Sequence, residues 1–219
     1  MAHYDLEEQE QIDSLRTWWR MYGNLVTGLI SAVAIVVVAW QGWTWYQRSQ
    51  SAQASMIYGA LEQAVAAGDA QRVKATAGEL TEKFGGTAYA PLGALMAAKV
   101  SFDASDLKTA RTQLAWVAQN GKDEVRDLAR LRLAAVLLDE KAYDEALRHL
   151  DGAHGAAFDA RFGESRGDVL AAQGKKTEAK AAYQGALAAL KTKDTEAEAS
   201  RNPYRQLLEQ KLNSLGGEA

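Results

Sequence analysis

The stretch Leu133-Ala-Ala-Val-Leu-Leu-Asp-Glu-Lys-Ala-Tyr-Asp-Glu-Ala-Leu-Arg-His-Leu150 contains the pattern that decides the fold. Two small residues, Ala134 and Ala146, stand twelve positions apart, and the polar turn residues Asp139-Glu-Lys141 lie between them. Apolar residues follow the three-to-four spacing of helices on both sides of the turn. Because antiparallel helices approach closely only where small side chains face each other, the stretch predicts a helical hairpin.

The same pairing of small residues recurs along the chain. The other pairs are Ala64 with Thr76, Ala98 with Ala110, and Gly167 with Ala179. Successive first members are 34, 36 and 33 residues apart, and each second member is followed four positions later by Leu80, Leu114, Leu150 or Tyr183. This period resembles the tetratricopeptide repeat, although the usual proline and the tryptophan-leucine-glycine signature of that repeat are absent. We therefore expect a solenoid of about four hairpins.

A second decisive stretch is the apolar run from Leu25 to Trp45. It lies within 27 consecutive residues without charge, and as a helix its 21 residues would cover about 31 Å, close to the hydrocarbon thickness of a bilayer. Five of the six tryptophans flank the run, as expected for rings at both headgroup layers. The run predicts a membrane anchor made by Leu25, Leu29, Ile30, Val33, Ile35, Val36, Val37, Val38, Trp40, Trp43 and Trp45.

An apolar run can also belong to a buried core helix or to a signal peptide. A buried helix of a soluble protein rarely runs this long without a charge. A cleaved signal peptide would use Ala52-Gln53-Ala54 as its cleavage site, but the leader would be acidic and its apolar region longer than usual. We expect an uncleaved single-pass anchor. Arg16 and Arg20 precede it and only Arg48 follows closely, which favours a cytoplasmic N-terminus and a periplasmic C-terminal part.

The chain thus divides into four predicted parts: an acidic cytoplasmic tail (1–20), a transmembrane helix (21–47), a tetratricopeptide-like repeat domain (48–201) and a C-terminal capping helix (202–219). Asn202-Pro203 predicts the start of the last helix. Its apolar face would consist of Tyr204, Leu207, Leu208, Leu212 and Leu215. The expected fold class is all-α, with one N-terminal transmembrane helix before the solenoid and its cap.

Composition excludes several classes of function. The 219 residues include no cysteine, so disulfides, thiolate metal sites and cysteine nucleophiles are excluded. A net charge of −3 without a basic block argues against nucleic acid as the main partner. His149 and His154 are five residues apart, which is not the spacing of a helical metal pair. We expect no enzymatic activity, no cofactor, no metal and no small-molecule substrate.

A helical solenoid offers a curved surface to another protein. In the two middle hairpins, the positions that should face the concave side are Leu92, Leu95, Phe102, Leu128, Leu131 and Leu138. Equivalent positions in the outer hairpins include Leu61, Gly68, Glu164 and Ala171. The apolar stripe predicts a partner groove for a hydrophobic segment, unless the final helix fills the groove itself.

The whole layout resembles the YfgM family of ancillary SecYEG translocon subunits. The resemblance rests on the tail Tyr4 to Gly23, the span with its late tryptophans, the degenerate hairpins and the segment Leu207-Leu-Glu-Gln-Lys-Leu-Asn-Ser-Leu215. It implies a bacterial inner-membrane protein beside the Sec translocon, with a PpiD-type periplasmic chaperone as partner and exported polypeptides as clients. It also implies that the cytoplasmic tail can contact a stress-response regulator.

Two hypotheses follow. The first is an interaction protein that docks at the translocon and assists the handover of exported polypeptides to periplasmic chaperones. The alternative is a regulatory protein whose acidic tail, which holds all of the net charge, is the working end. An adaptor of division or outer-membrane assembly would share the same repeats.

Overall fold

The computed structural model describes residues 6–191 and 202–216, and in these ranges the chain is helical and contains no strand. The elements are α1 (Leu6–Ala66), α2 (Ala70–Lys83), α3 (Tyr89–Asp103), α4 (Leu107–Asn120), α5 (Asp123–Asp139), α6 (Tyr143–Leu150), the short 3₁₀ helix η1 (Ala156–Phe158), α7 (Asp159–Ala172), α8 (Lys176–Lys191) and α10 (Pro203–Ser214). The predicted all-α class, with one long apolar N-terminal helix, is confirmed.

The chain forms two compact units, Met1–Gln50 and Ser51–Ala219. Helix α1 runs without a break across both borders predicted for this part of the chain, the one between residues 20 and 21 and the one between residues 47 and 48. No proline and no cluster of turn residues interrupts this part of the chain, so nothing ends the helix before Ala66. In the second unit the last part of α1 serves as the first helix of the first hairpin, because Ala54, Leu61 and Ala64 are buried there.

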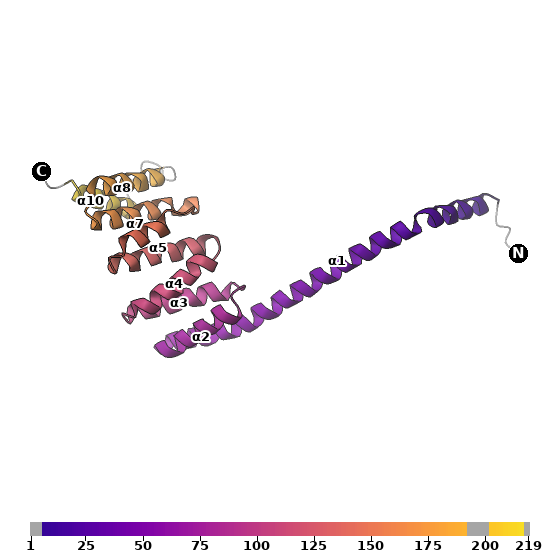
Figure 1. The fold of residues 1–219 in the computed structure, drawn as a ribbon, viewed down its shortest axis with the longest axis horizontal. Helices are drawn as coiled ribbons and strands as arrows, with labels where there is room; N and C mark the ends of the chain where they lie inside the picture. Colours follow the sequence, from indigo (N-terminus) through magenta and orange to yellow (C-terminus); the bar gives the residue numbers. More distant parts are fainter. Residues whose placement is uncertain (1–5, 192–201, 217–219) are drawn as a thin grey trace. The chain divides into compact units, whose positions relative to one another are not determined.

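The second unit consists of four helical hairpins that stack in chain order (Figure 1). The pairs are the end of α1 with α2, α3 with α4, α5 with α6, and α7 with α8. Each turn contains one residue with positive φ two positions after the first helix ends, namely Gly68, Ser105, Lys141 and Gly174. The residue after it donates its N–H to the carbonyl five positions earlier, as in Asp106 to Ser101 and Ala142 to Leu137. All four hairpin turns, including the predicted one at Asp139-Glu-Lys141, therefore fold by the same hydrogen-bonding motif.

Small residues allow neighbouring helices to approach closely, both within a hairpin and between hairpins. In the fourth hairpin, a Cβ added to Gly167 on α7 would lie 2.4 Å from Cε1 of Tyr183 on α8. Between the first two hairpins, a Cβ added to Gly93 on α3 would lie 2.6 Å from Cδ1 of Leu80 on α2. The large residues of the repeat pattern, Leu80, Leu114, Leu150 and Tyr183, are all buried. In the first hairpin the fully buried small residue is Ala77 rather than the expected Thr76, whose hydroxyl donates to the carbonyl of Arg72.

The hydrophobic core extends through the whole stack. Trp116 packs against both the cluster of the first hairpin and the central cluster formed by α3 to α7. Leu147 joins the central cluster to the one formed by α7, α8 and α10. Each hairpin therefore buries its apolar face against its neighbours, which is how repeat proteins gain stability.

The final helix covers the end of the stack. Asn202 accepts a hydrogen bond from the N–H of Tyr204 at 3.0 Å, and Pro203 occupies the first turn, as expected. Leu208 is fully buried against α7 and α8, whereas Leu207 is exposed, so the predicted apolar face is wrong at that position. The inward-facing positions are 204, 208, 212 and 215, which follow the helical period more regularly than a face that includes 207.

We expect Gly167→Ala to destabilise the second unit, because the added methyl group meets the ring of Tyr183. Overpacking of this kind costs about 1–3 kcal/mol. Gly185→Ala, in the partner helix α8, is the matched control, because a Cβ there meets nothing within 4 Å and should stabilise the helix by about 0.5–1 kcal/mol. Thermal unfolding followed by circular dichroism measures both. Equal effects of the two changes would contradict the close approach.

Candidate functional site: an exposed apolar helix and a partner surface

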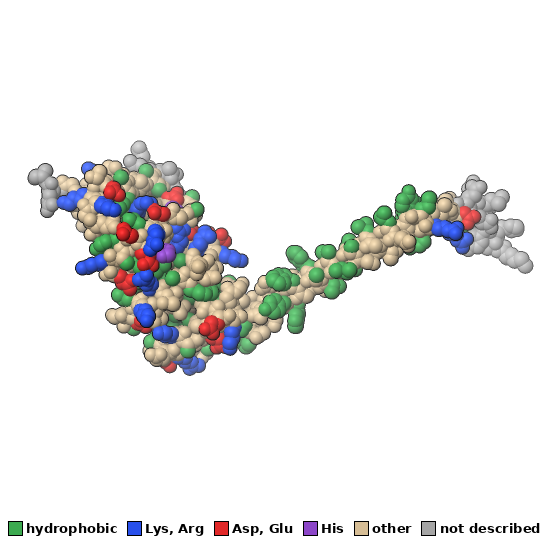
Figure 2. Space-filling model, in the orientation of Figure 1, with side chains coloured by type: hydrophobic (Ala, Val, Ile, Leu, Met, Phe, Trp, Pro, Cys, Tyr) green, Lys and Arg blue, Asp and Glu red, His purple; other side chains and the backbone are tan. Residues whose placement is uncertain are grey.

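The first unit exposes an apolar surface along helix α1. The large apolar side chains at the predicted anchor positions between Leu25 and Trp45 are 49% to 73% exposed. Figure 2 shows hydrophobic side chains along this part of α1, with charged side chains beyond it toward the N-terminus. In the described residues, α1 is the one helix long and apolar enough to cross a membrane. Because α1 is almost unburied over this segment, it is not the core helix of a soluble domain.

The structure separates the six predicted groove residues into three groups. Leu92 and Phe102 on α3 are exposed, by 41% and 44% respectively. Leu128, Leu131 and Leu138 on α5 are half-buried against the central core cluster. Leu95 is a core residue, only 7% exposed, which places it out of a partner's reach. Neighbouring helices cover Leu95, so exposure differs among the six positions that the sequence pattern places on one face.

A hollow of about 360 Å³ lies between α3 and α5. Its apolar lining consists of Ala98, Phe102, Leu114, Ala135 and Val136. Three charged residues, Lys99, Asp103 and Arg132, complete the lining. Phe102 is the one predicted groove residue in this hollow. The apolar periodicity that predicts the groove does not point to these charged residues, because they interrupt it.

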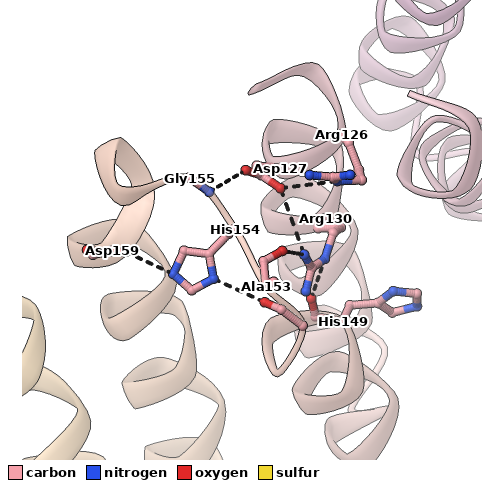
Figure 3. A network of polar contacts seen from close by, with 9 residues as sticks. Arg126, Asp127, Arg130, His149, Ala153, His154, Gly155 and Asp159 are labelled. Atoms are coloured by element: carbon pink, nitrogen blue, oxygen red, sulfur yellow. Dashed lines mark hydrogen bonds and ion pairs between the residues drawn. The ribbon is translucent and has the colours of Figure 1, made fainter. Parts of the chain in front are cut away.

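Helix α5, which carries one side of the hollow, also contains a buried ion pair. Asp127 and Arg130 have side chains only 2% and 10% exposed, and Nη1 of Arg130 lies 3.8 Å from Oδ1 of Asp127. Nε of Arg130 donates to the carbonyl of His149 and Nη1 to the carbonyl of Ala153, both at 2.8 Å. Oδ2 of Asp127 accepts from the N–H of Gly155 at 2.9 Å (Figure 3). The pair thereby fixes the connection between α6 and α7 to α5.

Aromatic contacts extend this network into the fourth hairpin. The guanidinium of Arg130 lies 5.1 Å from the ring centre of Phe162, and the ring of His154 stacks on Phe162 at 4.0 Å. His154 is also held through Nε2, which is 3.2 Å from Oδ1 of Asp159. Burial lowers the pKa of Arg130 despite the nearby carboxylate of Asp127. The network has structural contacts on every side, so we assign it a positioning role.

One sequence signal could have revealed this network. It lies, in each hairpin, four positions before the first small residue of the pair, which is Ala64, Ala98, Ala134 or Gly167. At this position the first, second and fourth hairpins carry Ala60, Ala94 and Gly163, whereas the third carries Arg130. A long charged side chain in place of a small one needs polar partners when it is buried. Those partners come from the unusually long connection after α6, whose course the repeat pattern does not predict.

The final helix, α10, covers the side of α7 that carries Glu164, a position predicted to lie on the concave face. Nζ of Lys211 contacts Oε1 of Glu164 at 2.7 Å and both carboxylate oxygens of Asp168 at 2.8 Å. The hydroxyl of Tyr204 donates to Oε2 of Glu164 at 2.7 Å. Burial, together with hydrogen bonds to these carboxylates, raises the pKa values of Tyr183 and Tyr204. None of the six predicted groove residues belongs to the core cluster that contains α10's Leu208.

Comparisons with known proteins agree with this architecture. The profile of the tetratricopeptide repeat-like domain family matches residues 16–217. The ancillary SecYEG translocon subunit of Neisseria gonorrhoeae (strain ATCC 700825 / FA 1090) is 33% identical over 215 residues, covering 96% of this chain and 98% of the relative. The proteins of the same name from Haemophilus influenzae (strain ATCC 51907 / DSM 11121 / KW20 / Rd) and Escherichia coli (strain K12) are 32% and 27% identical over 185 residues. They cover 84% and 82% of this chain, and 90% and 87% of their own lengths.

A solved structure shares the fold. MamA from Desulfovibrio magneticus RS-1 superposes with a TM-score of 0.50 at 17% identity, covering 74% of this chain and 92% of that protein. At this identity the similarity concerns the helical repeat architecture alone.

We expect Arg130→Met to lower the free energy of unfolding of the second unit. The change removes the buried cation of Asp127 and leaves the partly exposed Arg126, whose Nε lies 3.5 Å from Oδ1, as its remaining ion-pair partner. Breaking a buried pair typically costs 3–5 kcal/mol, so with this partial compensation a loss of about 1–3 kcal/mol is expected. Arg132→Met, two residues further along α5 and exposed, should change it by less than about 0.5 kcal/mol. Urea unfolding of both variants checks this. Similar midpoints for the two would show that the buried pair does not stabilise the connection.

Proposed function

The chain belongs to the family of ancillary SecYEG translocon subunits with tetratricopeptide-like repeats, and from this premise we propose that it is a membrane-anchored interaction protein associated with the SecYEG translocon. In this role it assists the handover of exported polypeptides to periplasmic chaperones. The observation that carries the proposal is the similarity to the Neisseria gonorrhoeae subunit over nearly the full length of both chains. The similarity includes the apolar part of α1 as well as the solenoid.

An uncleaved anchor agrees with the packing of the first hairpin. Ala54, the last residue of the candidate cleavage site, lies inside helix α1 and is fully buried in the first core cluster. Cleavage after Ala54 would remove that side chain from the core and cut the helix just before the part that pairs with α2. This supports a single-pass membrane protein that keeps residues 25–45 as its bilayer segment.

The orientation belongs to the same proposal. With Arg16 and Arg20 before the span and Arg48 after it, the N-terminus lies in the cytoplasm of a bacterial cell and the solenoid in the periplasm. There the exposed face of α3 and the half-buried face of α5 are open to other proteins. A PpiD-type chaperone and emerging exported chains are the partners proposed for this face.

The family is a non-enzymatic kind of protein, and no catalytic role is proposed for any residue. In the part of the chain that the structure describes, no group of three or more histidine, aspartate or glutamate residues could hold a metal ion. The hypothesis of a regulatory tail rests on acidic residues near the N-terminus. Residues 1–5 of that tail lie outside the described residues, so this hypothesis stays a prediction from the sequence.

The proposed topology predicts which side of the membrane each unit occupies. Because the natural chain has no cysteine, Ser14→Cys and Lys180→Cys each introduce one thiol, before and after the span. In cells whose outer membrane has been made permeable, a membrane-impermeant maleimide should label the cysteine at 180 and reach the one at 14 only after lysis. Labelling of position 14 in intact spheroplasts would contradict the orientation.

The proposed association predicts crosslinks from the open face. A photo-reactive residue at Leu92 or Phe102, both exposed, should capture exported polypeptides or a periplasmic chaperone in native membranes. The same group at Lys180, an exposed position on α8, serves as the control and should capture less. Full-length protein purified from mild detergent should also retain SecY, SecE and SecG. If it retains none of them, the proposed function is wrong.

A further inference from the structure

The hollow between α3 and α5 combines an apolar floor with one positive charge in excess at its rim. Its floor includes Phe102, 44% exposed, and Val136, which is buried in the central core cluster. At its rim Nζ of Lys99 lies 2.6 Å from Oδ2 of Asp103, so these two charges compensate each other. Arg132 is exposed and makes no hydrogen bond or ion pair with any residue that the structure describes. The hollow therefore carries one guanidinium without a counter-charge.

The size of the hollow limits what it can hold. About 360 Å³ is at the small end of ligand pockets, and the lining comes from one face of α3, one face of α5 and a single residue of α4. Such a space accepts one bulky side chain of a peptide, whereas a docked helix would need a groove extending over several turns. The guanidinium of Arg132 then selects the charge next to that side chain, because it binds carboxylates well.

We infer that this hollow binds exported polypeptides at segments in which a bulky apolar side chain stands next to a carboxylate. The apolar side chain enters between Phe102 and Val136, and the carboxylate of the neighbouring residue pairs with Arg132. This inference rests on the proposed function and specifies the class of client segment. Segments whose apolar residue is flanked by lysine bind less well, because their ammonium groups face the same guanidinium.

The charge preference is modest and depends on salt. Exposed ion pairs contribute about 0.2–1 kcal/mol, so one favourable pair changes affinity by roughly 1.4- to fivefold. A lysine in place of the carboxylate replaces the attraction with a repulsion. The ratio of affinities for carboxylate-flanked and lysine-flanked segments is therefore larger than the effect of one ion pair. Raising the ionic strength reduces the ratio, because the pair is exposed to solvent. The contribution of the apolar side chain persists at high salt.

The test uses full-length protein in lipid nanodiscs, which avoids free detergent that would enter an apolar hollow. Fluorescein-labelled peptides of ten residues carry one central phenylalanine flanked by two glutamates, two lysines or two serines, and a fourth peptide has glutamates without phenylalanine. Fluorescence anisotropy gives the affinity of each. The natural protein should bind the glutamate-flanked peptide at least about threefold more tightly than the lysine-flanked one, with the serine-flanked peptide between them.

Variants identify the residues responsible. Arg132→Glu should invert the preference, so that the lysine-flanked peptide binds more tightly, and Phe102→Ser should weaken all phenylalanine peptides at least about threefold. Arg72→Glu, an exposed charge reversal on α2, is the matched control and should leave the order unchanged. Unfolding midpoints confirm that each variant is folded.

Several outcomes overturn the inference. These are no binding of the phenylalanine peptides by the natural protein, equal affinities for the glutamate-flanked and lysine-flanked peptides, or an unchanged order in Arg132→Glu. The inference is also overturned if the glutamate peptide without phenylalanine binds as tightly as the glutamate-flanked phenylalanine peptide. Copurification of SecY with Arg132→Glu is measured in parallel. If both proteins retain SecY but the natural protein shows no preference between glutamate-flanked and lysine-flanked peptides, the inference fails and the proposed function stands.

Discussion

The close approach of neighbouring helices at small residues, within hairpins and between them, is the constraint on which the solenoid depends. Where Gly167 faces Tyr183 and Gly93 faces Leu80, a single added carbon would overlap a neighbouring side chain. These contacts limit how closely the helices can approach, and the left-handed residues Gly68, Ser105, Lys141 and Gly174 reverse the chain by the same hydrogen-bonding motif in each hairpin. The spacing in turn leaves a hollow between α3 and α5 that is continuous with the packed core.

Much of this architecture could be predicted from local sequence. Helical periodicity and turn residues located all four hairpins, because both are properties of a few neighbouring residues. The errors concern burial, which depends on the next helix in space. Leu95 has the spacing of a surface residue but lies in the central core cluster with residues of α5, and Leu207 has an apolar side chain on the side of α10 that no helix covers. Periodicity gives the face of a helix, while its neighbours determine how much of that face remains open.

The polar features needed the three-dimensional structure for a different reason. Asp127 and Arg130 lie three positions apart on α5, but their partners include the carbonyls of His149 and Ala153 and the N–H of Gly155, which lie at the end of α6 and in the connection after it. A buried guanidinium is tolerated only where such acceptors surround it. Arg132, two residues later, points to solvent and has no such partners among the described residues. The same side chain is thus structural at one position and open to a partner at the other.

The final helix explains why the open surface is confined to the middle of the stack. In the fourth hairpin, Glu164 stands at a position equivalent to the groove, and Asp168 lies four residues further along α7. Lys211 of α10 contacts both carboxylates, and Tyr204 donates to Glu164. In the third hairpin, the corresponding position three before the small residue is Leu131, and no charge there would hold a capping helix. A polar face on the last repeat therefore recruits the cap by specific hydrogen bonds. Among the described residues, the apolar face on α3 and α5 makes no such hydrogen bonds with α10 and stays partly exposed, which supports the proposal that it binds a segment of another chain.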